Sequence, residues 1–195
     1  MRLREIRRRV LGGDPSAIFR RYFVNTLFDS TFVVLGVMAA AAFSPDPVAP
    51  VALDIILAAC LAIGISTGVS VYEAEHTEGA IRMERLERAM LSSLKDTEVE
   101  RGILASRYAT SFVNFLAPLT VAAIAGTPLL LFEAGIIRDL LHAVFASTAL
   151  CIALIFGAGY YLGTLAGGRP WRKAVRMALV ATATFLLLAL IERTT

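Results

Sequence analysis

The feature that most constrains this chain is a series of apolar runs, each about as long as a bilayer is thick. A helix needs about 20 consecutive apolar residues to cross the hydrocarbon core of a membrane. Such runs recur along the chain, which is 57% hydrophobic and has a mean hydropathy of +0.69. The strict apolar–polar alternation of a membrane barrel is absent from the sequence. The sequence therefore predicts an all-α, polytopic membrane protein that lies in a lipid bilayer.

We expect five transmembrane helices and a cytoplasmic helical extension between the second and the third. The expected spans are residues 23–43, 51–72, 108–132, 140–165 and 175–190. The expected domains are a basic N-terminal segment (1–22), transmembrane helices one and two (23–72), a cytoplasmic amphipathic helical segment (73–103) and transmembrane helices three to five (104–195). The short sequence SPDP at 44–47 is expected to be a turn.

The extension begins where the second apolar run becomes charged, in the sequence EAEHTEGAIRMERLERAMLSSL. Because no proline separates the two parts, we expect one long helix, with a bend at Gly79 as the alternative. The sequence Thr97-Glu98-Val99-Glu100 has the capping-box pattern and predicts that a new helix starts there.

The N-terminal region also has features of a secretory signal peptide. It starts with several arginines, and its first apolar run ends in AAAAF near Phe43. That run is long for a signal peptide and contains Asp29, so we expect a retained first span.

The basic residues set the expected orientation. Lys and Arg cluster before span one, between spans two and three, and between spans four and five, whereas the opposite side has only Arg138 and Arg193. By the positive-inside rule the N-terminus is cytoplasmic and the C-terminus lies outside, and we expect a prokaryotic-type cell membrane. The excess of 19 Lys and Arg over 16 Asp and Glu is explained by these topology signals, so we expect no nucleic-acid partner.

Asp29 is the sharpest functional signal, because it is the acid that lies well inside an expected span. A carboxylate at membrane depth is costly and usually faces a cavity or a partner. One interpretation is a metal or proton ligand on a permeation path. The structural alternative is a neutral carboxyl group hydrogen-bonded to Asn25 or Thr31.

Several acids and a histidine follow the end of span two. Glu73 and His76 lie three residues apart, which is the spacing of Glu-x-x-His metal sites in helical bundles, and Glu75 and Glu78 form a second such pair. Carboxylates with one imidazole suit iron(II), manganese or zinc better than copper(I). The alternative is a solvated polar collar where the helix leaves the lipid.

Glu84 and Glu87 extend this set of candidate metal ligands along the same helix, beside Met83 and Met90. The alternative for Glu84 is an ion pair with Arg88, four residues on.

The remaining features have structural interpretations. Gly64 and Gly68 are spaced for close helix packing, within the chain or at a dimer interface, and Asn114 is expected to be an interhelical hydrogen-bond donor. Cys60 and Cys151 lie in apolar runs and are expected to be buried rather than disulfide-bonded. No phosphate-binding loop or nucleophile–base pair is evident, so we expect neither an enzyme nor a resident cofactor.

The chain resembles the vacuolar iron transporter family. The matching sequences are FDSTFVVLGV, TGVSVYEAEHTE, AGTPLLLF and YYLGTLAGGRPWRKAVRMAL. The resemblance implies a homodimer that exports ferrous iron or manganese from the cytosol in exchange for protons, with Asp29 at the family's first-span aspartate. The family's second-span glutamate and methionine fall near Ala59 and on Thr67, and the insert is shorter and poorer in acids.

Two functional hypotheses follow. The first is a dimeric divalent-metal/proton antiporter that uses Asp29 within the membrane and Glu73, His76 and nearby acids at its cytosolic side. The second is a non-transporting membrane scaffold or metal-binding protein derived from the same fold, which the residues Ala59 and Thr67 motivate.

Overall fold

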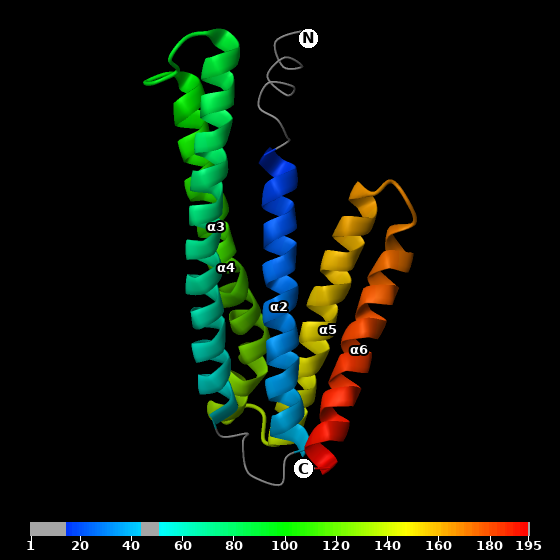
Figure 1. Cartoon of the computed structure of the whole chain (residues 1–195). Coiled ribbons are helices and arrows are strands. Elements are labelled where there is room, and N and C mark those ends of the chain that lie inside the picture. Colours follow the sequence, from blue (N-terminus) through cyan, green and yellow to red (C-terminus); the bar gives the residue numbers. More distant parts are fainter. Residues whose placement is uncertain (1–14, 44–50, 195) are drawn as a thin grey trace. The chain divides into compact units, whose positions relative to one another are not determined.

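A computed structural model describes residues 15–43 and 51–194, and within these ranges every regular element is a helix. The helices are α2 (Pro15–Phe43), α3 (Ala52–Met90), α4 (Glu98–Glu133), α5 (Leu140–Leu165) and α6 (Pro170–Thr194), as Figure 1 shows. All five are long and apolar enough to cross a membrane. This confirms the all-α class, and a helix of spanning length is present at each of the five expected spans. The N-terminal part of the predicted basic segment and the predicted turn at 44–47 lie outside the described residues.

The chain divides into two compact units, and the boundaries fall within helices. The first unit contains α2 as far as Thr26 together with Gly64–Ala117. The second unit contains Leu27–Ile63 and Pro118–Thr195. Asp29 therefore belongs to the second unit, and the acids that follow Tyr72 belong to the first.

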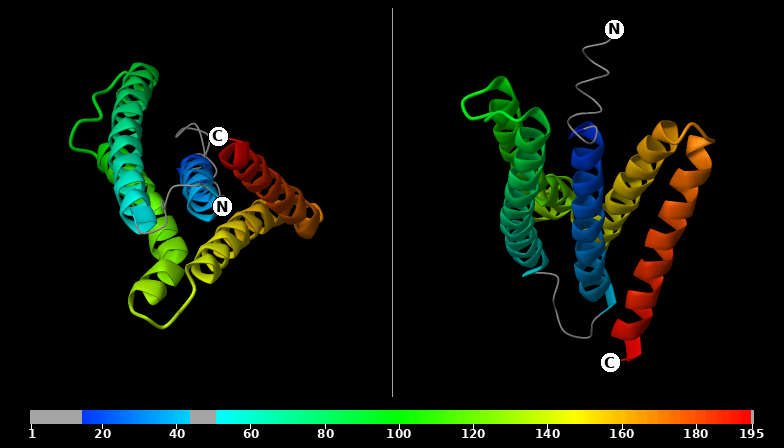
Figure 2. Two further views of the ribbon diagram at one scale, coloured as in Figure 1. Left: turned by 90° about the horizontal axis from the view of Figure 1, so that it is seen from below. Right: turned by 45° about the horizontal axis from the view of Figure 1, so that its top comes forward.

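In the first unit, α3 and α4 run antiparallel. Gly64 and Gly68 lie against Phe115, whereas Gly79, later in α3, lies against the earlier residue Ile103. The two helices lie side by side over this length in both views of Figure 2. Beyond the expected spans they form a helical hairpin, residues 73–90 of α3 and 98–107 of α4.

Helix α3 continues through Gly79 for all of its 39 residues, as expected from the absence of proline. A Cβ atom at residue 79 would lie 2.9 Å from Cγ2 of Ile103. The glycine therefore allows α3 and α4 to approach closely, and this contact is its structural role in the hairpin.

The tip of the hairpin begins with a Schellman-type helix end. The N–H of Ser92 donates to the carbonyl of Glu87 at 3.3 Å, and Leu91 adopts the left-handed conformation with φ of 49°. Glycine usually occupies this position, since a Cβ atom is strained there. Leu91 is 93% exposed, so its side chain takes no part in the packing of the hairpin.

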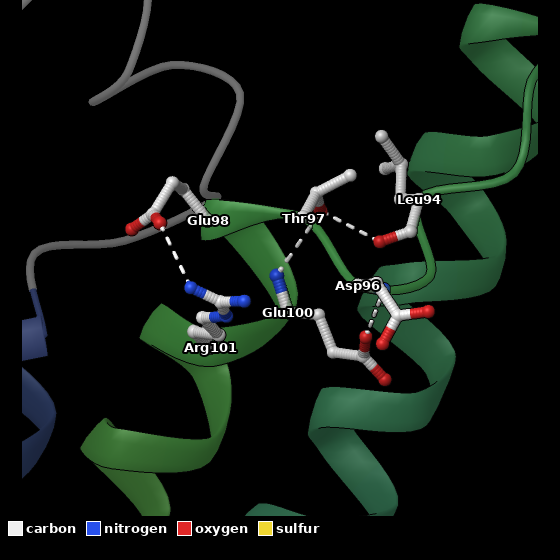
Figure 3. A network of polar contacts seen from close by, with 6 residues as sticks. All are labelled: Leu94, Asp96, Thr97, Glu98, Glu100 and Arg101. Carbon is white, nitrogen blue, oxygen red and sulfur yellow. Dashed lines mark hydrogen bonds and ion pairs between the residues drawn. The ribbon is translucent and has the colours of Figure 1, made fainter.

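The start of α4 carries the predicted cap (Figure 3). The Thr97 hydroxyl donates to the carbonyl of Leu94 at 2.6 Å and accepts the N–H of Glu100 at 3.5 Å. The Glu100 carboxylate accepts the N–H of Asp96 at 2.7 Å, one residue before the position that a capping box uses. Thr97 is thus the N-cap, as the sequence predicts.

We expect Leu91→Gly to stabilise the hairpin. The substitution removes about 1 kcal/mol of backbone strain and no buried contact. Part of this gain is lost because glycine gives the unfolded chain more conformational freedom. Thermal unfolding in detergent should show a midpoint higher by a few degrees. Met90→Gly is the matched control. Met90 is the last residue of α3, where glycine disfavours the helix, so this variant should have a lower midpoint. A lower midpoint for Leu91→Gly would contradict the prediction.

In the second unit, α5 and α6 form an antiparallel pair (Figure 1). Asp139 caps α5 by accepting the N–H of Leu141 at 3.1 Å. Helix α6 begins at Pro170, because proline fits the first helical position, where its missing N–H costs nothing. The helix therefore begins five residues before the expected span at 175–190.

The core of the second unit is made of aliphatic and small side chains, and the largest fully buried ones include Leu35, Met38, Ile56 and Ile155. Cys60 and Cys151 are both buried and free, as predicted. Phe43 packs its ring against Phe145 and Phe185 at centroid distances of 6.5 and 6.2 Å.

Candidate metal-binding residues and polar contacts

Asp29 lies in the middle of α2, and its side chain is exposed. Its neighbours Ser30 and Thr31 are both fully buried, so the opposite side of the helix faces the protein core. The Thr31 hydroxyl donates to the carbonyl of Leu27 at 2.7 Å, as is usual for threonine within a membrane helix. Asp29 therefore lies on the more exposed side of α2, away from the buried Ser30 and Thr31.

The predicted metal ligands after Tyr72 lie along α3 in the first unit. Glu73, His76 and Glu78 are exposed, and Glu75 is half-buried. The His76 ring stacks on Tyr72, with ring centroids 6.4 Å apart and an interplanar angle of 25°. Glu73 and His76 thus occupy the accessible surface of one helix, three residues apart.

Within residues 15–43 and 51–194, no three His, Cys, Asp or Glu side chains come together in a group able to hold a metal ion. A tightly held metal normally needs more protein ligands than one Glu–His pair provides. A cation at this pair would keep most of its water, or would take ligands from another molecule.

Glu84 and Glu87 make contacts within the hairpin. Glu84 forms an ion pair with Arg88 one turn along α3, and both side chains are well exposed. Glu87 Oε1 accepts the N–H of Leu94 at 2.8 Å and the Ser93 hydroxyl at 3.3 Å. Glu84 therefore forms the ion pair that was the alternative to metal binding. Glu87 is hydrogen-bonded to the residues that connect α3 to α4.

A buried polar contact joins α2 to α4 inside the first unit. The Thr26 hydroxyl donates to Asn114 Oδ1 at 2.9 Å, and Asn114 Nδ2 donates to the carbonyl of Thr110 at 3.0 Å. Asn114 is fully buried. The predicted interhelical hydrogen bond is present, but Asn114 accepts it, and its amide donates within its own helix.

Thr67 has a backbone role that the sequence analysis missed. Pro118 has no N–H to offer the carbonyl of Asn114, four residues earlier in α4. The Thr67 hydroxyl lies 3.4 Å from that carbonyl oxygen and 3.3 Å from the carbonyl oxygen of Gly64. A membrane helix needs such a substitute donor where a proline interrupts its ladder. The position of Pro118, four residues after Asn114, is the sequence signal for it.

The glycines of α3 make this contact possible. A Cβ atom at residue 64 would lie 2.8 Å from the carbonyl oxygen of Phe115, and one at residue 68 would lie 3.1 Å from Phe115 Cβ. The Ser111 hydroxyl donates to the carbonyl of Gly68 at 2.6 Å. Gly64 and Gly68 therefore serve packing within one chain, which is one of the two roles that their spacing allowed.

A second missed feature is the buried charge of Arg107, on α4. The guanidinium carbon lies 4.7 Å from the ring centroid of Tyr72 and 5.1 Å from that of Tyr108. Arg107 is 9% exposed, and its buried Nε has no hydrogen-bond partner. Each cation–π contact contributes about 0.5–2 kcal/mol, whereas burying an ion costs several kcal/mol. The two rings therefore offset only part of the cost of burial.

Comparisons with known proteins show a distant similarity. The chain is 24% identical over 182 residues to the uncharacterized protein MJ0645 of Methanocaldococcus jannaschii, and the match covers 89% of this chain and 88% of that protein. No family model matches the chain. No solved structure matches it either. The similarity extends over nearly the whole length of both proteins and assigns no activity to either.

Proposed function

We propose that the protein is a carrier of divalent metal ions, iron(II) or manganese, which exports them from the cytosol in exchange for protons. The observation that supports it is the exposed carboxylate of Asp29 in the middle of an apolar helix. An ionised carboxylate is not stable against lipid tails. A carboxylate at this depth usually faces a cavity, a cation or a polar partner, which is the setting that a metal or proton ligand needs.

The same argument supports a homodimer. Asn25 and Val33 are also exposed, and they lie one helical turn to either side of Asp29. A second copy of α2 placed against this face would shield the acid from lipid and could leave a polar path between the copies. In this proposal the N-terminus and the helical hairpin are cytoplasmic, and the C-terminus lies outside.

Glu73 and His76 would collect the metal at the cytosolic side. Both are exposed, and they combine a hard oxygen ligand with an imidazole nitrogen, which favours iron(II), manganese or zinc. Glu75 and Glu78 would add negative charge nearby and raise the local cation concentration. Glu84 and Glu87, which have partners in the hairpin, would contribute least.

The direct test is metal flux into liposomes that contain the purified full-length protein. We expect saturable manganese or iron(II) flux that changes with an imposed proton gradient and is absent from empty liposomes. The absence of saturable flux under any gradient would reject the carrier.

A non-transporting membrane scaffold or metal-binding protein is the second candidate. It is favoured by the absence of a three-ligand group among the described residues and by Thr67, whose hydroxyl is engaged with backbone carbonyls. This candidate predicts no flux, even if metal binds to the helical hairpin, so flux separates the two.

We further expect His76→Ala to weaken metal collection and spare the transport step. Loss of one neutral ligand should raise the half-saturating metal concentration by about three- to ten-fold, equivalent to about 0.7–1.4 kcal/mol, with maximal flux little changed. His142→Ala is the matched control, because this exposed histidine pairs with Asp139 on α5 and lies outside the proposed site. Equal effects of the two substitutions would contradict the role of His76.

A further inference from the structure

The buried guanidinium of Arg107 has the surroundings of an incomplete anion site. It is the charged residue among the buried polar residues of the described chain. The rings of Tyr72 and Tyr108 contact each other, with centroids 5.6 Å apart, and both lie against the guanidinium group. Nε has no hydrogen-bond partner, and none of the ion pairs in the described ranges involves Arg107. What is missing is an acceptor with negative charge.

The position of Arg107 and the two tyrosines at the ends of two expected spans indicates that the missing anion is a lipid head group. Tyr72 closes the second expected span and Tyr108 opens the third, so both tyrosines fall where aromatic side chains mark the membrane interface. A guanidinium group there can donate two parallel hydrogen bonds to one phosphate. Other arginines of this region, such as Arg88 and Arg101, have carboxylate partners and exposed side chains.

We propose that Arg107 binds the phosphate of a phospholipid of the cytoplasmic leaflet, with Tyr72 and Tyr108 as the walls of the site. Tyr108 is 58% exposed and forms the outer wall. Because Nε is buried, the proposal requires the more exposed of the two rings, Tyr108, to move when the head group binds. Moving the Tyr108 ring gives up its cation–π contact with Arg107, and charge-assisted hydrogen bonds from the guanidinium to a phosphate offset this loss.

The competing partner is Glu73, which follows Tyr72 directly on α3 and is exposed. The negative charge of Glu73 opposes binding of an anion nearby. The alternative to a lipid phosphate is an ion pair between Arg107 and a Glu73 side chain in another rotamer. The structure has no ion pair between the two residues. The proposal depends on the membrane level of the hairpin but not on metal transport, so the two can fail separately.

The test measures lipid binding to the full-length protein in detergent by native mass spectrometry, with phosphatidylglycerol as the probe. We expect one saturable high-affinity site in the wild type and an affinity at least about ten-fold lower in Arg107→Gln, because charge-assisted hydrogen bonds are lost. Arg101→Gln, on the same helix with a 70% exposed side chain, should bind within about two-fold of the wild type. Equal binding by Arg107→Gln would overturn the proposal.

Competition on the wild type identifies the ligand and needs no variant, so it decides the matter if Arg107→Gln does not fold. Diacylglycerol, which lacks the phosphate, should not displace the lipid, and displacement at equal concentration would overturn the site. Displacement by millimolar inorganic phosphate alone would overturn the assignment to a lipid. If Glu73 were the partner, Glu73→Gln and Arg107→Gln would lower the unfolding midpoint equally and the double variant no further, which would also overturn it.

Discussion

Asp29→Asn should reduce manganese or iron(II) flux to the background of empty liposomes. Asparagine keeps the size and hydrogen-bonding ability of the side chain but removes the charge that a divalent cation or a proton requires. The loss should therefore reach at least about 100-fold, which corresponds to about 2.7 kcal/mol or more of lost stabilisation of the transported ion. Asp29→Glu should retain part of the flux, because the charge stays and only its position changes.

The matched control for this prediction is Asp54→Asn. Asp54 is also an exposed aspartate of an apolar helix, but it lies in the first turn of α3, near the expected outer surface. Its substitution should leave flux within about two-fold, since a charge at a helix end is readily solvated. Unchanged flux in Asp29→Asn, or equal losses in the two variants, would reject the assignment of Asp29.

The largest structural effect is expected from Gly163→Ala in the second unit. A Cβ atom at residue 163 would lie 2.5 Å from Cα of Pro170 and 2.8 Å from its carbonyl oxygen. Both are backbone atoms, so α5 and α6 would have to separate. Such overpacking costs about 1–3 kcal/mol, or about 2–12 °C in the unfolding midpoint of a chain of this size.

Gly157→Ala gives the matched control on the same helix. A Cβ atom at residue 157 has no neighbouring heavy atom within 4 Å. The alanine should therefore be neutral, or should stabilise by up to about 1 kcal/mol through its higher helix propensity. The account of the α5–α6 contact would be contradicted if both alanine variants unfolded at the same temperature.

The sequence was most informative where one physical signal decides the outcome. The bounds predicted for the fourth span, 140–165, are those of α5, because an apolar run with Asp139 before it sets both ends. The continuity of α3 past Tyr72 followed from the absence of proline. The start of α4 followed from Thr97, whose hydroxyl accepts an N–H of the first turn.

The site was less predictable, because it depends on which faces of the helices pack together. Helix α2 is apolar nearly all round, so its sequence marks Asp29 as unusual without showing that its side chain is exposed. Arg107 was counted among the topology charges, and its burial depends on the register of α3 against α4. That register is fixed by the contacts of Gly64 and Gly68 with Phe115. The spacing of the two glycines is equally compatible with packing at a dimer interface, so the sequence does not determine the register.

The account depends most on whether water and cations reach the carboxylate of Asp29, and cysteine labelling in intact liposomes measures this directly. Asp29→Cys should react with a water-soluble, positively charged methanethiosulfonate reagent, whereas the native Cys60 and Cys151, which are buried, should not. Asn25→Cys, one turn away with Asp29 intact, should also react and should be protected by manganese. An unreactive cysteine at position 29, alongside a reactive one at an exposed hairpin residue such as Glu78, would contradict the carrier and leave the five-helix membrane fold as the remaining conclusion.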